Sequence, residues 1–554
     1  MIKRIIISMF MILIACLIYC QEAEQMTRDQ MIEDIRQLSD IFETVHPDPY
    51  IKGGGKIAFH RRLHELISSI PENGLSRVDF GWMLQEFTGR MQDSHSRIRV
   101  PLNFNDNKPG GIPIYFNVIE DMLYTYGYIT KFFDPPFGSV LLSVEGVKIN
   151  EIKRRYGDLL GIQNNKYNVL ANLRSALWND VWIARILPEW KERGKILIEL
   201  KHPDGGVKKY SLTIPSNIEY PLHTTKSKVV MPSARKCDFE YKFLDNTKET
   251  ALLVINSMVS YREAFEIWHS LGRSSLIQQF KGAYKRAKGI NPPDDVEDII
   301  AGIPSATETF LSLLKEMKSA ETKNLIIDLR RNDGGSSTMA NILIYLIYGE
   351  EKLLSVNSKG REVKKLSQHY FKLHSKESVD TVNKGKKIPL IINDYIFIED
   401  KYGWNMDMTV KIREITKNNW QSRILQMPTF KTIYDAGEFN GYFTPENIVV
   451  ISSSSTFSSG FTLMEKFYRA GALVVGRPSG QEPNAFGSWQ EFTLNNSKIV
   501  GYVSHKRFYS FPEDSELASV LKPHHELTYD KFKSYNFDKN ADILFALEIL
   551  SNIK

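Results

Sequence analysis

Cysteine is scarce in this 554-residue chain, which contains Cys16, Cys20 and Cys237 and no other. The first two lie in an apolar N-terminal segment that we expect to be removed on export, which would leave Cys237 alone. A single cysteine can form neither an intrachain disulfide nor a cysteine-rich metal site. The sequence therefore predicts a fold that depends on its apolar core for stability.

Several functional motifs are also absent. The chain has no His-Glu-x-x-His zinc motif, no phosphate loop and no dinucleotide-binding fingerprint, and His524-His525-Glu526 is too compact to hold a metal alone. We therefore expect no metal and no cofactor. Lys and Arg number 71 against 65 acids, and they are dispersed rather than gathered in a basic block. A role in nucleic-acid binding therefore has little support.

The N-terminus has the pattern of an export signal. Lys3 and Arg4 precede an apolar run over residues 5–19, which is shorter than the roughly 20 residues of a membrane-spanning helix. We expect a signal peptide over residues 1–20 and a periplasmic, secreted or lipid-anchored product. Cleavage after Cys20 is one possibility. Because Leu-Ile-Ala-Cys resembles a lipoprotein processing box, a lipid anchor at Cys16 is the other.

The rest of the chain divides into three parts that differ in their pattern of apolar and turn-forming residues. Residues 21–100 have apolar side chains at three- and four-residue steps, which predicts helices. Residues 101–220 contain short strands between Gly, Pro and Asp clusters, with a helical insert at about 152–191. From 221 to 554, short aliphatic runs such as IPLIIND and NIVVISS alternate with helices, which predicts an α/β core. Charged, aromatic-rich text at about 352–440 indicates an insertion in that core.

Two strand-to-helix turns carry the strongest local signals. In VVISSSSTFSSG a buried strand ends in serines and a helix begins near Ser459, so a hydroxyl would sit at a helix N-terminus. The alternative is that these serines simply cap the helix. In NLIIDLRRNDGG a strand runs into Gly334 and Gly335, whose backbone can approach a ligand closely. The alternative there is an ordinary turn that needs glycine.

Histidine supplies a third signal. His95, in MQDSHSRIRVP, lies where a predicted helix gives way to a strand. A lone histidine is more often a capping or core residue than a catalytic one. We interpret His46, in ETVHPDPY, as structural.

Taken in order, these segments resemble one family. IIDLRRNDGG followed by VVISSSSTFSSG is similar to the tail-specific or C-terminal processing serine peptidases, and HPDPY with QDSH resembles the branch that includes the tricorn protease core. GSVLLSVEGVKINEI is similar to the PDZ-like element of these enzymes. The resemblance implies a multidomain α/β fold. Its parts would be a helical N-terminal domain, a β-rich PDZ-like domain and a ClpP/crotonase-like peptidase core.

The resemblance also assigns roles to residues. Thr456-Phe457-Ser458 matches the family signature and makes Ser458 the nucleophile, with oxyanion donors from the backbone of Ser459 and of Gly334 or Gly335.

The general base would come from far away in the sequence. Ser94-His95 matches the Ser-His pair of the tricorn-like branch, so His95 would be the base. Glu516 stands where that branch places a glutamate that orients the pair through the serine, with Glu513 one turn away as an alternative.

The chain departs from the family at several points. The processing peptidases use a Ser/Lys dyad, but no lysine lies between Lys466 and Lys498, which favours the histidine mechanism. Phe461 replaces the glutamate after the nucleophile, which suggests a changed pocket. The usual Pro-Asp near the end reads Pro523-His524. Because the helix after Ser458 is one residue short, Ser459 is a second candidate nucleophile, ranked well behind.

The sequence as a whole predicts an exported serine peptidase that cleaves peptides or proteins, with a PDZ-like domain that captures peptide C-termini. The alternative is a catalytically inactive protein on the same scaffold that binds peptides or small apolar ligands. Polysaccharide hydrolysis is a weaker alternative, because no carboxylate pair stands out.

Overall fold

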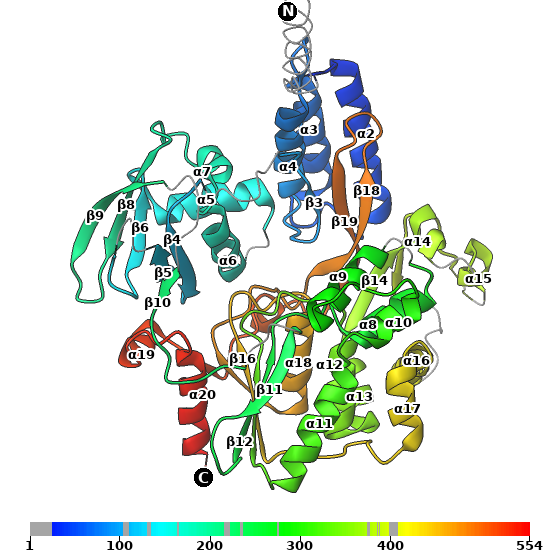
Figure 1. Ribbon diagram of the computed structural model, residues 1–554. Coiled ribbons are helices and arrows are strands. Elements are labelled where there is room, and N and C mark those ends of the chain that lie inside the picture. The colour runs from blue at the N-terminus through cyan, green and yellow to red at the C-terminus, as the bar shows by residue number, and fades with distance from the viewer. Residues whose placement is uncertain are drawn as a thin grey trace, which may run out of the picture.

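The computed structural model describes residues 25–102, 110–129, 134–162, 165–214, 222–232, 237–273, 276–373, 377–384, 386, 388–397 and 408–553. The expected signal peptide, with Cys16 and Cys20, lies outside the described residues. Within them, no helix is both long and apolar enough to span a bilayer. Figure 1 shows the N-terminal helices at one end of the molecule, a β-rich part beside them, and a larger α/β core below.

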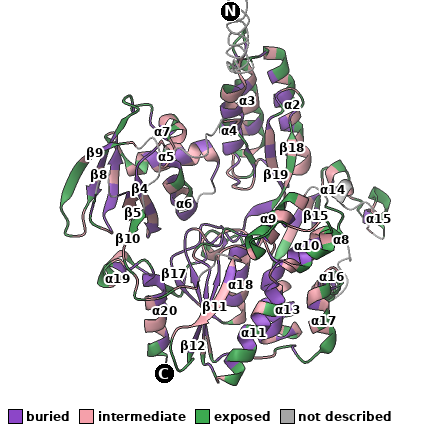
Figure 2. Ribbon diagram, in the orientation of Figure 1, coloured by how far each residue is buried: buried purple, intermediate pink, exposed green. Residues whose placement is uncertain are grey.

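The α/β core is built on a sheet whose described strands follow the order β11-β12-β13-β16-β17-β20. All neighbouring pairs are parallel except β11–β12. The strands are β11 (Phe239–Phe243), β12 (Thr250–Ile255), β13 (Asn324–Asp328), β16 (Asn447–Ser452), β17 (Leu473–Gly476) and β20 (His525–Glu526). Their continuous aliphatic runs are buried on both faces, as Figure 2 shows for the centre of the sheet.

Helices cover both faces of this sheet. Leu253 and Ile327 pack on one face against helices α11 and α12, while Leu252 and Ile326 face α20 and the β-rich part. The helices of the core are α8 (Arg262–Ser270), α9 (Ile277–Lys288), α10 (Val296–Ala301), α11 (Ala306–Ser319), α12 (Thr338–Tyr348), α18 (Ser459–Ala470), α19 (Tyr529–Ser534) and α20 (Ala541–Asn552). The alternation of side chains thus makes one sheet the centre of two apolar clusters.

The N-terminal helices enclose a hairpin that extends from the core. The elements are β1 (Gln25–Met26), α2 (Arg28–Val45), α3 (Gly55–Ser68), β2 (Leu75–Ser76), α4 (Arg77–Gly89) and β3 (Arg97–Ile98), with hairpin strands β18 (Phe486–Thr493) and β19 (Val500–Tyr509). Leu494, Ile499 and Val503 of the hairpin are buried in the same apolar cluster as the helices. At its tip, Asp34 accepts the Ser497 N–H at 2.8 Å. The hairpin therefore fixes the N-terminal helices to the core.

The β-rich part carries a helical insert, as expected. Its strands are β4 (Ile114–Ile119), β5 (Met122–Ile129), β6 (Val140–Val144), β7 (Val147–Lys148), β8 (Lys195–Lys201), β9 (Val207–Thr213) and β10 (Leu222–Thr224), and its helices are α5 (Ile149–Leu160), α6 (Lys166–Ala176) and α7 (Asp180–Ile186). The hairpin of β8 and β9 turns at Gly205, as the Asp-Gly-Gly sequence predicts.

The segment at 352–440 extends the hairpin's sheet rather than the central one. It contains α13 (Glu350–Asn357), β14 (Arg361–Lys365), α14 (Gln368–Leu373), α15 (Val379–Asn383), β15 (Tyr395–Phe397), α16 (Met408–Ile424) and α17 (Pro428–Ala436). Strand β14 pairs with β19 and β15. The expectation that IPLIIND forms a core strand is wrong. Asn393 adopts a φ of 79° within a turn, and Ile388 and Ile391 are exposed.

A buried charge cluster joins the β-rich part to the core. Arg477 donates to Asp542 at 2.6 Å through Nη2, and its Nη1 donates to the Val118 carbonyl of β4 at 2.8 Å. Arg330 donates to Asp328 at 2.8 Å and also approaches Asp542. The Asp542 carboxylate, almost fully buried, therefore pairs with both arginines, and Asp328 supplies the second negative charge.

We expect Asp542→Asn to destabilise the protein, because it leaves two buried guanidinium groups with one carboxylate between them. Breaking such a pair costs about 3–5 kcal/mol, measurable as a lower midpoint of urea denaturation. The matched control is Asp435→Asn, which removes an exposed pair with Lys431 and should change the midpoint little. Equal midpoints for the two variants would show that the cluster does not stabilise the fold.

Candidate active site

Ser458 occupies a strained position between β16 and α18. Its backbone has φ 51° and ψ −121°, a region that residues other than glycine rarely adopt. Its side chain makes no capping hydrogen bond to the helix, so the alternative that Ser458 is a side-chain cap is wrong. The half-buried hydroxyl makes no hydrogen bond to any described residue, and the strained turn places it at the N-terminus of α18.

Hydrogen bonds join the turn at Ser458 to the loop that follows β13. The Phe457 N–H donates to the Asn332 carbonyl at 2.9 Å, and the Thr456 hydroxyl donates to the Leu329 carbonyl at 2.8 Å. The Asn332 amide in turn donates to the Ile255 carbonyl at the end of β12 at 3.1 Å. Because parallel strands end at the same edge of a sheet, the two loops meet there and hold each other.

The glycine loop lies directly against Ser458. A Cβ atom on Gly334 would stand 2.7 Å from the Ser458 Cβ and 2.9 Å from the Ser459 nitrogen, so only glycine fits. The Gly334 N–H donates to the Asn332 side chain at 3.0 Å and is therefore occupied. Within the described chain, the N–H groups of Gly335 and Ser459 make no hydrogen bond. Of the two glycines offered by the sequence, Gly335 is the one that retains a donor.

Ser459 has its hydroxyl committed elsewhere. It donates to the Gly335 carbonyl at 2.6 Å, which fixes the side chain in the loop. The next departure from the family also has a structural explanation, since Phe461 is 4% exposed and packs in the main core cluster. The Phe461 side chain is therefore part of the core.

His95, from the N-terminal part, lies against Phe457, the residue before Ser458. Its imidazole stacks on the Phe457 ring, with centroids 5.2 Å apart and planes at 26°. On the other side, a Cβ on Gly487 at the base of the hairpin would lie 3.9 Å from His95 Cε1. No hydrogen bond joins His95 to Ser458, and neither the buried His95 Nδ1 nor the Ser94 hydroxyl has a partner in the described chain.

Two opposing effects set the charge of His95. Burial lowers the pKa of its imidazole, and the Arg97 charge lowers it further. The Asp93 carboxylate and a backbone hydrogen bond at Phe486 raise the pKa, but burial prevails. The ring is therefore neutral at pH 7, the form that can accept a proton.

No hydrogen bond or ion pair joins Glu516 to Ser94 or His95. It lies in an exposed turn of 3₁₀-helix, η3 (Glu516–Ala518), and its carboxylate makes no hydrogen bond or ion pair among the described residues. Glu513 is also exposed and pairs with Arg507 at 2.6 Å. The buried Lys466 amine donates to Asn341 on α12.

Two functional neighbours were missed by sequence reasoning. Gln481, in the loop after β17, accepts the Ser458 N–H at 3.3 Å. Asp93 accepts the backbone N–H of His95 at 2.9 Å and is itself completely buried with His46. Asp93 stands two residues before His95, which is the one local signal that could have drawn attention to it.

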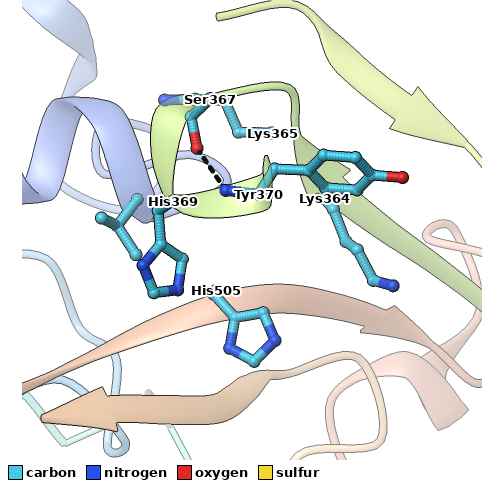
Figure 3. Close-up of a pocket in the computed structure, with 7 residues that line it drawn as sticks. Lys364, Lys365, Ser367, His369, Tyr370 and His505 are labelled. Atoms are coloured by element: carbon cyan, nitrogen blue, oxygen red, sulfur yellow. Dashed lines mark hydrogen bonds between the residues drawn. The ribbon is translucent and has the colours of Figure 1, made fainter. Parts of the chain in front are cut away.

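A separate polar pocket lies between the N-terminal part and the 352–440 segment. In Figure 3 the imidazoles of His369 and His505 face one another across it. Its lining includes neither Ser458 nor His95. Burial lowers the pKa of His505 to about 3, so this ring is uncharged near neutrality.

Comparison with known proteins finds similarity in sequence over part of the chain and in fold over most of it. Residues 295–517 match the family model described as Peptidase family S41. No curated protein sequence matches the chain. The expected α/β fold with a peptidase core is confirmed.

Solved structures extend the likeness over nearly the whole chain. Mature CPAF complexed with lactacystin is 13% identical, covers 95% of this chain and 99% of its own, and has a TM-score of 0.52. A CPAF mutant is 12% identical over 93% of this chain and 96% of its own, with a TM-score of 0.54. At such identities the likeness shows the fold.

We expect Gly334→Ala to reduce peptide hydrolysis by about a hundredfold. The added methyl group would stand too close to the Ser458 Cβ and would push the Ser458 side chain out of position. Gly205→Ala is the matched control. It also has a positive φ, at 95°, but nothing lies within 4 Å of the added Cβ. Unchanged turnover in Gly334→Ala would mean that the loop does not position the nucleophile.

Proposed function

We propose that this chain, whose residues 295–517 match the model of peptidase family S41, is a serine peptidase that cleaves peptide bonds through an acyl-enzyme on Ser458 with His95 as general base. The observation that carries the proposal is the strained turn at Ser458, where a free hydroxyl stands beside two unoccupied backbone donors. Strain of this kind persists only where the surrounding contacts impose it, and it concentrates at functional sites.

The reaction would run in two stages. His95 takes the hydroxyl proton as Ser458 Oγ attacks the substrate carbonyl, and the resulting oxyanion accepts hydrogen bonds from the N–H groups of Ser459 and Gly335. The imidazolium then gives its proton to the leaving amine, which leaves an acyl ester on Ser458. A water molecule, deprotonated by His95, hydrolyses the ester and restores the serine.

The proposal requires a movement that brings His95 within hydrogen-bonding distance of Ser458. His95 stacks beside Phe457 without a hydrogen bond to Ser458, and catalytic hydrogen bonds are often long in a free enzyme and shorten with substrate bound. Phe457 stacks on the imidazole and Gly487 lies close to its Cε1, which restricts the movement of the ring.

Location and substrate follow from different observations. The basic and apolar N-terminus supports an exported enzyme, in the periplasm, secreted or lipid-anchored at Cys16. Peptides or proteins are the substrate class of the family. The β-rich part supports a PDZ-like role in binding peptide ends. A role for Glu516 behind Ser94 rests on the sequence resemblance alone.

Labelling of the purified protein with a fluorophosphonate tests the nucleophile and base. We expect one label, on Ser458 by peptide mass spectrometry, and none on Ser458→Ala. The matched control Ser459→Ala should still be labelled, since its hydroxyl is bound to the Gly335 carbonyl. In His95→Ala the labelling rate should fall about a hundredfold or more.

Each arm of this experiment can contradict the proposal. A parent protein that resists labelling, while thermal unfolding shows it folded, would favour the inactive binding protein. A label that persists in Ser458→Ala would place the nucleophile elsewhere. Full reactivity of His95→Ala would remove the general base.

A further inference from the structure

We infer that Asp93, held by His46, is the carboxylate that supports His95 during catalysis, and that it acts through its buried charge and the His95 backbone. This inference rests on the proposed role of His95 as general base. It assigns to the active site two residues from segments 47 positions apart, HPDPY and QDSH, which the geometry brings into direct contact.

The Asp93 carboxylate is fully satisfied and fully enclosed. His46 Nε2 lies 3.2 Å from Asp93 Oδ2, and both side chains are 0% exposed. The Ser96 hydroxyl donates to the same oxygen at 2.5 Å, and the His95 N–H donates to Oδ1 at 2.9 Å. Ser96 is itself held by the Ser504 N–H of strand β19 at 3.0 Å. Asp93 is thus fixed by the N-terminal helices and by the hairpin of the core.

The hydrogen bonds of His46 establish the charge of the pair. Its Nδ1 accepts the Asp48 N–H at 3.1 Å, so the ring proton resides on Nε2 and is donated to Asp93. The Phe486 ring packs on the same imidazole, with centroids 4.4 Å apart. Burial opposes ionisation of Asp93, but the hydrogen bond from His46 favours the ionised form, and the Asp93 pKa lies well below its usual range. A neutral His46 with an ionised Asp93 leaves one negative charge beside His95.

No other described carboxylate is in a position to supply this charge. Glu482, in the loop after β17, also interacts with Asp93, but it is paired with Lys52 at 2.5 Å and burial raises its pKa. Arg97 on the segment of His95 carries the opposite charge, and Glu516 is exposed. The negative field at the imidazole therefore comes from Asp93.

The chemistry of the first step explains why this charge matters. When His95 takes the Ser458 proton, a buried neutral ring becomes a buried cation, which is costly unless an anion lies close by. In the familiar Ser-His-Asp arrangement the carboxylate bonds the imidazole Nδ1 directly. Here Asp93 accepts a hydrogen bond from the His95 backbone N–H. Its charge therefore stabilises the imidazolium through space, and its hydrogen bond fixes the backbone that carries the ring.

The pH dependence of kcat/KM distinguishes this electrostatic role from a merely structural one. The acid limb reports the pKa of His95 in the free enzyme, because only the neutral ring accepts a proton. Asp93 raises that pKa, so Asp93→Asn lowers it, and the acid limb should move to lower pH by about one unit. The weaker base and the unsupported imidazolium should also reduce kcat about tenfold or more.

Matched variants isolate the charge. Asp93→Glu keeps the charge, so its acid limb should stay close to that of the parent even where kcat falls. Ser96→Ala removes one hydrogen bond to the carboxylate and keeps the charge, and it should likewise leave the limb in place. Glu516→Gln removes an exposed carboxylate and should leave the acid limb in place.

Folding of each variant is checked by its thermal unfolding midpoint. Should Asp93→Asn fail to fold, Asp93→Ser removes the same charge and should shift the acid limb in the same direction.

The outcomes separate this inference from the function beneath it. Full activity in His95→Ala would overturn the proposed mechanism. Loss of activity in His95→Ala, together with an unmoved acid limb in folded Asp93→Asn, would overturn the role of Asp93 alone. An acid limb that moves in Glu516→Gln but not in Asp93→Asn would transfer the supporting role to Glu516.

Discussion

The active site depends on one set of backbone hydrogen bonds, those that join the loop after β13 to the loop after β16. Asn332 is central to them. Its carbonyl accepts a hydrogen bond from the Phe457 N–H, its side-chain oxygen accepts one from the Gly334 N–H, and its side-chain amide donates to the Ile255 carbonyl at the end of β12. These bonds impose the strained backbone at Ser458. They also decide which donors remain, because occupation of the Gly334 N–H leaves those of Gly335 and Ser459 for an oxyanion.

The second constraint is that buried charged side chains are paired with groups from other parts of the molecule. Arg477 joins the core to β4 of the β-rich part, and Asp93 joins His95 to the N-terminal helices and the hairpin. In both places a charge sits where loops of different parts meet. Since an unpaired charge in such a place is costly, the pairs also fix how the parts are arranged.

The division of the site between parts has a consequence for catalysis. The proposed nucleophile and oxyanion donors belong to the core, whereas His95, the proposed base, follows the N-terminal helices and lies near Phe457, Gly487 and Asp93. The hairpin of β18 and β19 provides the rigid link, because its tip is buried among those helices. Alignment of base and nucleophile is therefore a property of the packing between the two parts.

Short-range patterns were enough to single out residues that the structure brings close together. Ser458, the two glycines and His95 each lie at a junction between regular elements, and such junctions are readable from aliphatic runs, glycine and serine. IPLIIND is an exception. Its aliphatic composition predicts a strand, but the segment forms a turn at Asn393. Tertiary structure alone decided that Gly335 rather than Gly334 keeps a free N–H, that Phe461 faces the core, that Glu516 is exposed, and that Asp93 and His46 form a buried pair. Those outcomes depend on contacts between residues far apart in the chain, and burial and hydrogen-bond occupancy are properties of such contacts rather than of local sequence.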